Sequence, residues 1–129
     1  MEFPEDVKYS KEHEWVLVEG NVATVGITDY AQDQLGDIVF VELPAVGDKV
    51  SREDAFGVVE SVKAVSDIYA PVTGKVLEVN DDLPDNPEIL NEDPYGDGWI
   101  IKIEMSDPDE IDDLLSSTEY EEYVAEEKE

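Results

Sequence analysis

Between residues 15 and 105 the chain is a succession of short segments rich in Val, Ile and aromatic residues, each ended by Gly, Pro, Asn or Asp. Such segments are typical of β-strands, and many of them at short spacing favour an antiparallel barrel or sandwich. We expect strands at residues 15–18, 22–27, 37–43, 55–61, 65–70, 75–79 and 99–105. The sequence therefore predicts a mainly β fold.

Two segments depart from the strand pattern. Residues 29–35 lie between a threonine that can cap a helix start and a glycine that can end one, which predicts a short helix. Beyond Asp107, a first-turn proline precedes apolar residues at helical spacing, so we predict C-terminal helices at about 108–127. We expect this apolar stripe to pack on the core: Ile111, Leu114, Leu115, Tyr120, Tyr123 and Val124.

Residues 1–129 should form a single domain, because this length leaves no room for a second independent core. Residues 80–98 are interrupted by Pro84, Pro87 and Pro94 and carry no clear strand or helix signal. Apolar side chains can hold this segment on the core, so we expect an ordered loop and not a linker. These side chains are Leu83, Ile89, Leu90 and Tyr95.

Acidic residues dominate the charge: 35 Asp and Glu stand against 8 Lys and Arg, for a formal net charge of −27. A surface this negative repels nucleic acid and anionic lipid and attracts basic partners. No run approaches the roughly 20 apolar residues of a membrane span, and no basic segment leads into an apolar one at the start. We therefore expect a cytoplasmic protein that binds neither nucleic acid nor membrane.

The acidic surface leads to a hypothesis of adaptation to a high-salt cytoplasm, since dissolved salt screens repulsion between like charges. Under this hypothesis the thermal midpoint of unfolding should rise steeply as molar salt is added. A midpoint that does not respond to molar salt would contradict it, and the acidic surface would then serve solubility alone.

The segment from Ala55 to Ala70 has the pattern of a β-hairpin, with two β-rich arms around Val62-Lys63-Ala64. Two strands would hold a lysine at this tip out in water, where an enzyme can reach it. The chain has seven lysines, so only its position can distinguish Lys63 from the others. The residues alone predict an exposed hairpin lysine that is open to modification.

A weak internal repeat surrounds this hairpin. Residues 44–47 and 71–74 are both Pro-x-x-Gly turns, and each leads to a Lys-Val pair, one before Lys63 and one after it. Two copies of a strand-turn unit related by a two-fold axis would leave the hairpin at one end of a flattened barrel.

Residues 60–64, Glu-Ser-Val-Lys-Ala, resemble the lipoylation segment of glycine cleavage H proteins, and Gly47 and Gly74 resemble the flanking glycines of lipoyl domains. Further resemblance covers nearly the whole chain, at His13–Val16, Val25–Thr28, Ala31–Gln32, Leu35–Asp37, Val41–Pro44, Asp93–Gly96 and Gly98–Trp99. The resemblance implies a flattened barrel-sandwich hybrid of the lipoyl/biotinyl type, with the lipoyl hairpin at about 55–70.

This resemblance also implies a non-catalytic carrier with lipoate attached to Lys63 through an amide. Such a carrier shuttles an aminomethyl intermediate and reducing equivalents between glycine decarboxylase, aminomethyltransferase and dihydrolipoamide dehydrogenase. A lipoylating enzyme would recognise Glu60, Gly47 and Gly74 around the target lysine. The disulfide chemistry would belong to the cofactor, so a chain without cysteine can serve.

Family members shelter the loaded arm in a cleft whose carboxylates pair with the cationic amine. The residues at matching positions here are Glu14 and Asp67. Tyr30 and Gln34 stand where relatives often have histidines, which puts histidine contacts to the arm in doubt. We expect a structural role for His13, the only histidine, beside Trp15.

Several other functions stay open on the sequence. An H-like protein could relay lipoyl groups to other enzymes, and a biotinyl domain shares the fold, although its lysine is usually flanked by methionine. A different class is an acidic, non-catalytic interaction or metal-binding β domain. Calcium ligands for it could come from Asp81, Asp82, Asp85 and Glu88, whose spacing does not match an EF-hand. One histidine, no cysteine and no plausible catalytic triad argue against a free-standing enzyme.

Overall fold

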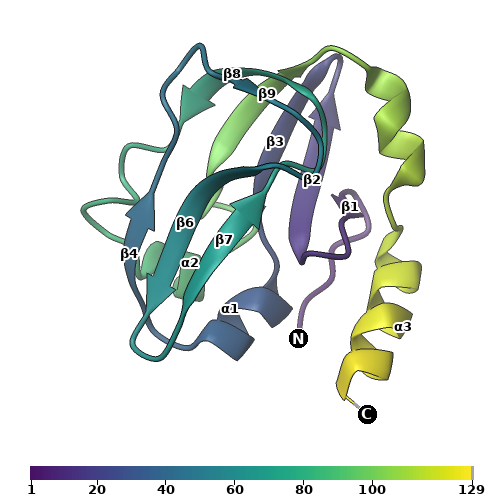
Figure 1. The fold of residues 1–129 in the computed structure, drawn as a ribbon. Coiled ribbons are helices and arrows are strands. Elements are labelled where there is room, and N and C mark those ends of the chain that lie inside the picture. Colours follow the sequence, from purple (N-terminus) through teal and green to yellow (C-terminus); the bar gives the residue numbers. More distant parts are fainter. Residues whose placement is uncertain (129) are drawn as a thin grey trace.

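The structure is a computed structural model that describes residues 1–128, and its strands form two antiparallel sheets (Figure 1). The six-stranded sheet has the order β1 (Lys8–Tyr9), β2 (Glu14–Glu19), β3 (Val22–Ile27), β9 (Ile101–Met105), β8 (Gly74–Val79), β5 (Lys49–Val50). The three-stranded sheet has the order β4 (Ile38–Glu42), β6 (Ala55–Ser61), β7 (Val65–Tyr69). The predicted mainly β class is confirmed, with two sheets that do not close into a barrel.

Short helices complete the fold. They are α1 (Asp29–Leu35), α2 (Ile89–Glu92), the 3-10 helix η1 (Pro108–Asp113) and α3 (Ser117–Lys128). The hydroxyl of Thr28 accepts the N–H of Ala31 at 3.1 Å and caps α1, and Gly36 ends that helix with a φ of 80°. The short helix and the helical C-terminus are therefore as predicted, although the first C-terminal turn is 3-10.

The two repeated turns meet in the six-stranded sheet. β5 follows the turn at residues 44–47, and β8 begins at the last residue of the turn at 71–74. These two strands pair antiparallel, with Lys49 opposite Lys75. A Cβ on Gly74 would collide with the carbonyl oxygen of Glu104, and Gly47 has a φ of 95°. Gly74 is therefore required by the close approach of β9, and Gly47 by its positive φ.

The main hydrophobic core lies between the two sheets and under residues 80–98. Leu83 and Leu90 of that segment are completely buried, so the expected ordered loop is held on the core. A second, aromatic cluster joins the N-terminal strands to α3, where Tyr9 and Tyr120 stack with ring centroids 4.6 Å apart. Tyr120 and Val124 are buried in this cluster, which confirms core packing for that part of the C-terminal stripe.

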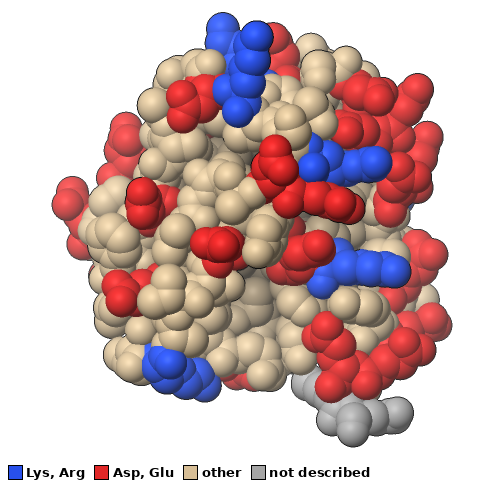
Figure 2. All heavy atoms as spheres, viewed as in Figure 1, with Lys and Arg blue, Asp and Glu red and all other residues tan. Residues whose placement is uncertain are grey.

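Charge is unevenly distributed over the face shown in Figure 2. Acidic side chains crowd the right-hand edge, over η1 and α3, while the lower left, over the β6–β7 hairpin, is mostly uncharged. Within residues 1–128, no helix is long and apolar enough to cross a membrane.

Candidate functional site

Lys63 lies in the turn that joins β6 to β7. Ser61, which is 6% exposed, stabilises this turn: its backbone N–H donates to the Ala64 carbonyl at 2.8 Å, and its hydroxyl oxygen accepts the N–H of Ala64 at 3.0 Å. The Lys63 N–H approaches the same hydroxyl at 3.3 Å. The side chain of Lys63 is exposed, as the hairpin pattern predicts. A closed turn on two strands therefore presents this side chain to solvent.

The tip rests on the turn between α1 and β4. The N–H of Val62 donates to the carbonyl of Asp37 at 3.0 Å, and Ser61 pairs with Ile38. The aliphatic part of Lys63 lies over Gly36, so that a Cβ built on this glycine would be 3.4 Å from Cε of the lysine. The Gly36–Asp37 turn is thus the surface against which the lysine lies.

Apolar side chains surround the tip and are exposed to solvent. The exposed fractions are 69% for Val62, 66% for Val65, 52% for Val39 and 46% for Phe40. Phe40, Glu60 and Val65 are cross-strand neighbours, so their side chains share the outer face of the three-stranded sheet. Glu60 thus lies among apolar groups three residues before the lysine.

Asp67 lies further along the same outer face. It pairs with Val58 and is exposed. Alternate residues of a strand point to the same side, so Val65, Asp67 and Tyr69 follow one another on this face of β7. The face begins beside Lys63 and ends at a pocket, because Tyr69 is part of the pocket lining.

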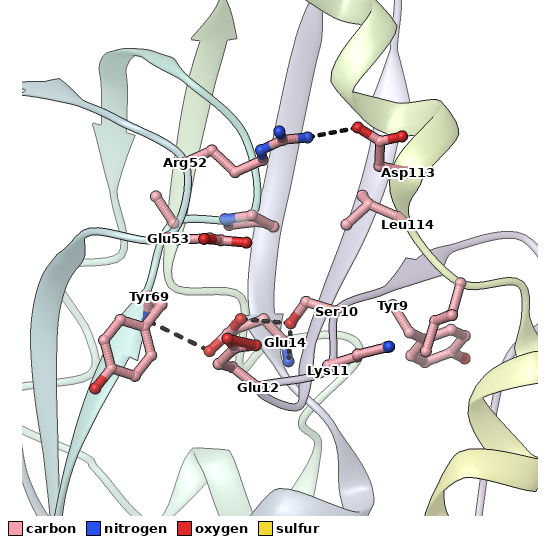
Figure 3. Close-up of a pocket in the computed structure, with 13 residues that line it drawn as sticks. Tyr9, Ser10, Lys11, Glu12, Glu14, Arg52, Glu53, Tyr69, Asp113 and Leu114 are labelled. Atoms are coloured by element: carbon pink, nitrogen blue, oxygen red, sulfur yellow. Dashed lines mark hydrogen bonds and ion pairs between the residues drawn. The ribbon is translucent and has the colours of Figure 1, made fainter.

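This pocket, of about 160 Å³, separates β7 from the segment that follows η1 (Figure 3). Ser10, Glu12 and Glu14 line one part of it, and Arg52 and Asp113 lie at another, joined by an ion pair of 2.7 Å. No pattern in the sequence predicts that Ser10, Tyr69 and Arg52 meet here, because they come from distant parts of the chain. Asp67 and Lys63 are not among the lining residues.

Glu14 is the buried acid of this pocket, with 2% of its surface exposed. The hydroxyl of Ser10 donates to Oε1 at 2.5 Å, and the N–H of Tyr69 donates to Oε2 at 3.3 Å. Burial raises the pKa of Glu14 to about 7, although both hydrogen bonds act in the opposite direction. Among the side chains that the structure describes, no lysine or arginine forms an ion pair with this carboxylate.

A buried carboxylate that lines a pocket and lacks a cationic partner is suited to bind a cation that enters from solvent. A cation in the pocket, for example a protonated amine, would stabilise the ionised form of Glu14 in place of the water that burial excludes. The pocket therefore offers one specific chemical feature, which is a desolvated carboxyl group that a bound cation would favour in its ionised form.

The other residues singled out from the sequence lie elsewhere. In Figure 1, β8, which Gly74 begins, runs across the top of the molecule, far from the hairpin tip at the lower left. Tyr30 is buried beside the His13 ring, whereas Gln34 is exposed on α1. Tyr30 thus packs in the aromatic cluster.

His13 connects the N-terminal strands to α3. Nδ1 lies 2.8 Å from the hydroxyl of Tyr120, and Nε2 lies 3.0 Å from the carboxylate of Glu127. Burial lowers the pKa of His13, and the nearby Glu127 only partly offsets this effect. The histidine is structural as expected, but its ring contacts tyrosines, while the Trp15 indole packs against Tyr95.

The calcium hypothesis gains no support from the described part of the chain. Within residues 1–128, no group of three or more His, Asp or Glu side chains converges as a metal site would require. The acids of residues 81–88 are all exposed.

Two antiparallel sheets that present a lysine at a hairpin tip define the class of lipoyl/biotinyl-type carrier domains. A family model described as Glycine cleavage H-protein matches residues 7–127. The chain belongs to this family.

Individual relatives agree with the family model. The chain is 60% identical over 126 residues to the glycine cleavage system H protein of Carboxydothermus hydrogenoformans, covering 98% of this chain and 97% of the relative. It is 59% identical over 126 residues to that of Staphylococcus haemolyticus, covering 98% and 100%. The crystal structure of a glycine cleavage system H protein from Mycobacterium marinum superimposes with a TM-score of 0.85 at 38% identity, covering 98% of this chain and 99% of the other.

Proposed function

We propose that this chain is the lipoyl-bearing carrier of a glycine cleavage system. It would carry the aminomethyl group and reducing equivalents between glycine decarboxylase, aminomethyltransferase and dihydrolipoamide dehydrogenase in the cytoplasm. It would act as a carrier without catalysis of its own. The observation that carries this proposal is the exposed Lys63 at a closed hairpin tip in a member of the H-protein family.

The residues at the tip fit an attached lipoyl group. Lipoate joined to Nζ of Lys63 would supply the thiol and disulfide chemistry. Lys63 needs to be accessible to the lipoylating enzyme when the amide forms, and its exposure allows this. Glu60 lies on the same face as the surrounding apolar side chains, which supports its proposed role in recognition by the lipoylating enzyme. The assignment of Gly47 and Gly74 to the same recognition stays a prediction.

The outer face of β7 supports a path for a loaded arm from the tip to the pocket. From Val65 to Tyr69 the strand extends roughly 13 Å, a distance comparable with the reach of an acylated lysine. On this path Asp67 would contribute negative charge from an exposed position, and Glu14 would pair with a cationic amine inside the pocket. Arg52 and Asp113 would limit the access of water at the other part of the pocket.

The acidic surface is suited to transient docking. Long-range attraction to basic patches raises association rates, while exposed charge pairs add little to lifetime. The apolar residues around Lys63 would make the short-range contacts, so that one surface serves several enzymes in turn. A lipoyl relay to other enzymes would use the same tip and remains the second candidate.

The proposal is tested with protein from its native host and with reconstituted enzymes. Intact mass and peptide mapping should find an acyl-sized increment on the peptide that contains Lys63 and on no other peptide. The acylated chain, and not the unmodified chain, should support glycine-dependent release of carbon dioxide and ammonia by the three enzymes. An acylated chain that fails in this assay but donates its lipoyl group to other proteins would favour the relay.

A further inference from the structure

Among the described residues 1–128, the hairpin tip makes one backbone hydrogen bond to the rest of the molecule besides those of its own turn and of the β4–β6 ladder. This bond runs from the N–H of Val62 to the carbonyl of Asp37. The orientation of Lys63 therefore depends on where the backbone of residues 36–38 lies. That segment begins with Gly36, which has a φ of 80°. Glycine can adopt many other backbone conformations as well, so contacts from neighbouring groups must select this one.

Asn91, in α2, supplies this support with its whole side-chain amide. Its Oδ1 accepts the N–H of Ile38 at 2.9 Å, and its Nδ2 donates to the carbonyl of Gly36 at 2.9 Å. The same Nδ2 donates to Oε1 of Gln32 at 3.0 Å. One half-buried side chain thus binds both sides of the turn and the helix before it.

We propose that Asn91 is a positioning residue for Lys63, which it acts on through the turn at residues 36–38. Asn91 holds Gly36 and Ile38, the two ends of this turn. In this conformation the carbonyl of Asp37 accepts the N–H of Val62, and Gly36 lies beneath Lys63. Without Asn91 the turn would adopt several conformations, and only a fraction of molecules would present the amine in the orientation an acylating enzyme requires. The inference rests on the proposed function of Lys63 as an acylation site.

The chemistry at Nζ would be unchanged in such a variant, so the effect should be on recognition. When only a fraction of a protein is in the binding-competent state, its apparent affinity falls by that fraction. The KM of the lipoylating enzyme for the unmodified carrier should therefore rise, while kcat stays the same. Because residues 36–38 lie against the tip, the backbone of Val62 should report the same loosening directly.

Asn80 offers a matched control from the same loop. Its amide also makes three hydrogen bonds, to the carbonyls of Asp97 and Trp99 at 2.8 and 2.7 Å and from the N–H of Asp82 at 3.2 Å. None of these partners belongs to the turn or to the hairpin. Asn80→Ala should therefore lower stability without changing the presentation of Lys63.

The experiment compares Asn91→Ala, Asn80→Ala and the unchanged protein in two measurements. We expect Asn91→Ala to increase hydrogen exchange at the Val62 amide by about fivefold or more, and to raise the KM for lipoylation by a similar factor, from the loss of hydrogen bonds of ordinary strength. Asn80→Ala should leave both quantities unchanged once global stability is taken into account. Equal effects of the two variants on both quantities would overturn the proposal.

A second variant keeps the test decisive if Asn91→Ala does not fold. Asn91→Asp retains an acceptor for the N–H of Ile38 but loses both donated bonds, including the one to Gly36. It should also raise exchange at Val62, and wild-type exchange in Asn91→Asp would overturn the proposal. If the unchanged protein is not lipoylated, the proposed function fails, and the exchange measurement still reports whether Asn91 supports the tip.

Discussion

Lys63→Arg should abolish acylation and all carrier activity while leaving the fold unaltered. The guanidinium group stays protonated at any working pH, so it cannot attack an activated acyl group as an amine does. The side chain is exposed, and substitutions at such positions change the free energy of unfolding by about 0.5 kcal/mol or less. Intact mass after incubation with a lipoylating enzyme measures the first effect, and thermal unfolding measures the second.

Lys75→Arg is the matched control, since Lys75 is an exposed lysine of β8 in the other sheet. This variant should be acylated as fast as the unchanged protein and should support full activity. An acyl increment on the Lys63→Arg protein would contradict the assignment of the attachment site. A large loss of stability in that variant would show instead that the contact of Lys63 with Gly36 stabilises the fold.

Glu14→Gln should remove a pH dependence of stability that the buried carboxyl creates. In the folded protein the pKa of Glu14 is about 7, against about 4.5 when the residue is exposed to water. Between these values the folded state binds more protons than the unfolded state, so stability falls as the pH rises from 4.5 to 7. The shift corresponds to about 3 kcal/mol at higher pH.

Denaturant unfolding of both proteins from pH 4.5 to pH 8 measures this effect. The stability of Glu14→Gln relative to the unchanged protein should rise by about 3 kcal/mol across that range. Glu12→Gln is the matched control, because Glu12 lines the same pocket but is exposed. It should show no comparable trend. A constant difference between Glu14→Gln and the unchanged protein would show that the carboxyl is not desolvated.

The same substitution should also expose a cationic amine on the loaded arm. The ionised carboxylate stabilises a cation in the pocket, and an amide cannot supply that charge. Loaded Glu14→Gln protein should therefore lose its cargo to water faster than loaded Glu12→Gln. Protection in the unchanged protein should weaken at acidic pH, where Glu14 becomes protonated, and the paired amine should place this loss below the pKa of about 7 that Glu14 has in the empty pocket. Equal rates of loss in the two variants would remove Glu14 from the proposed cleft.

The longer strands and helices could be predicted because each carries its own local signal. The hairpin from Ala55 to Tyr69 has two arms rich in β-branched and aromatic residues, and its centre falls at Lys63. The two-residue strands β1 and β5 and the four-residue helix α2 carry no such signal. Their existence depends on partners far along the chain, such as the pairing of Lys49 with Lys75.

The sequence by itself determined that the chain is a mainly β protein and that one lysine lies at a hairpin tip. Both conclusions depend on strand and turn preferences, which act over a few neighbouring residues. The family resemblance singled out Glu14, but the residues alone could not show that Glu14 is desolvated and Glu12 is not, since Glu12 lies two residues before Glu14 at the start of β2. Only the tertiary structure decided this. Tyr69 and Ser10 close around Glu14 and remove its water, and Asn91 reaches across the fold to the turn beneath Lys63. Desolvation and long-range hydrogen bonds depend on which distant segments meet, and that information is absent from any short stretch of residues.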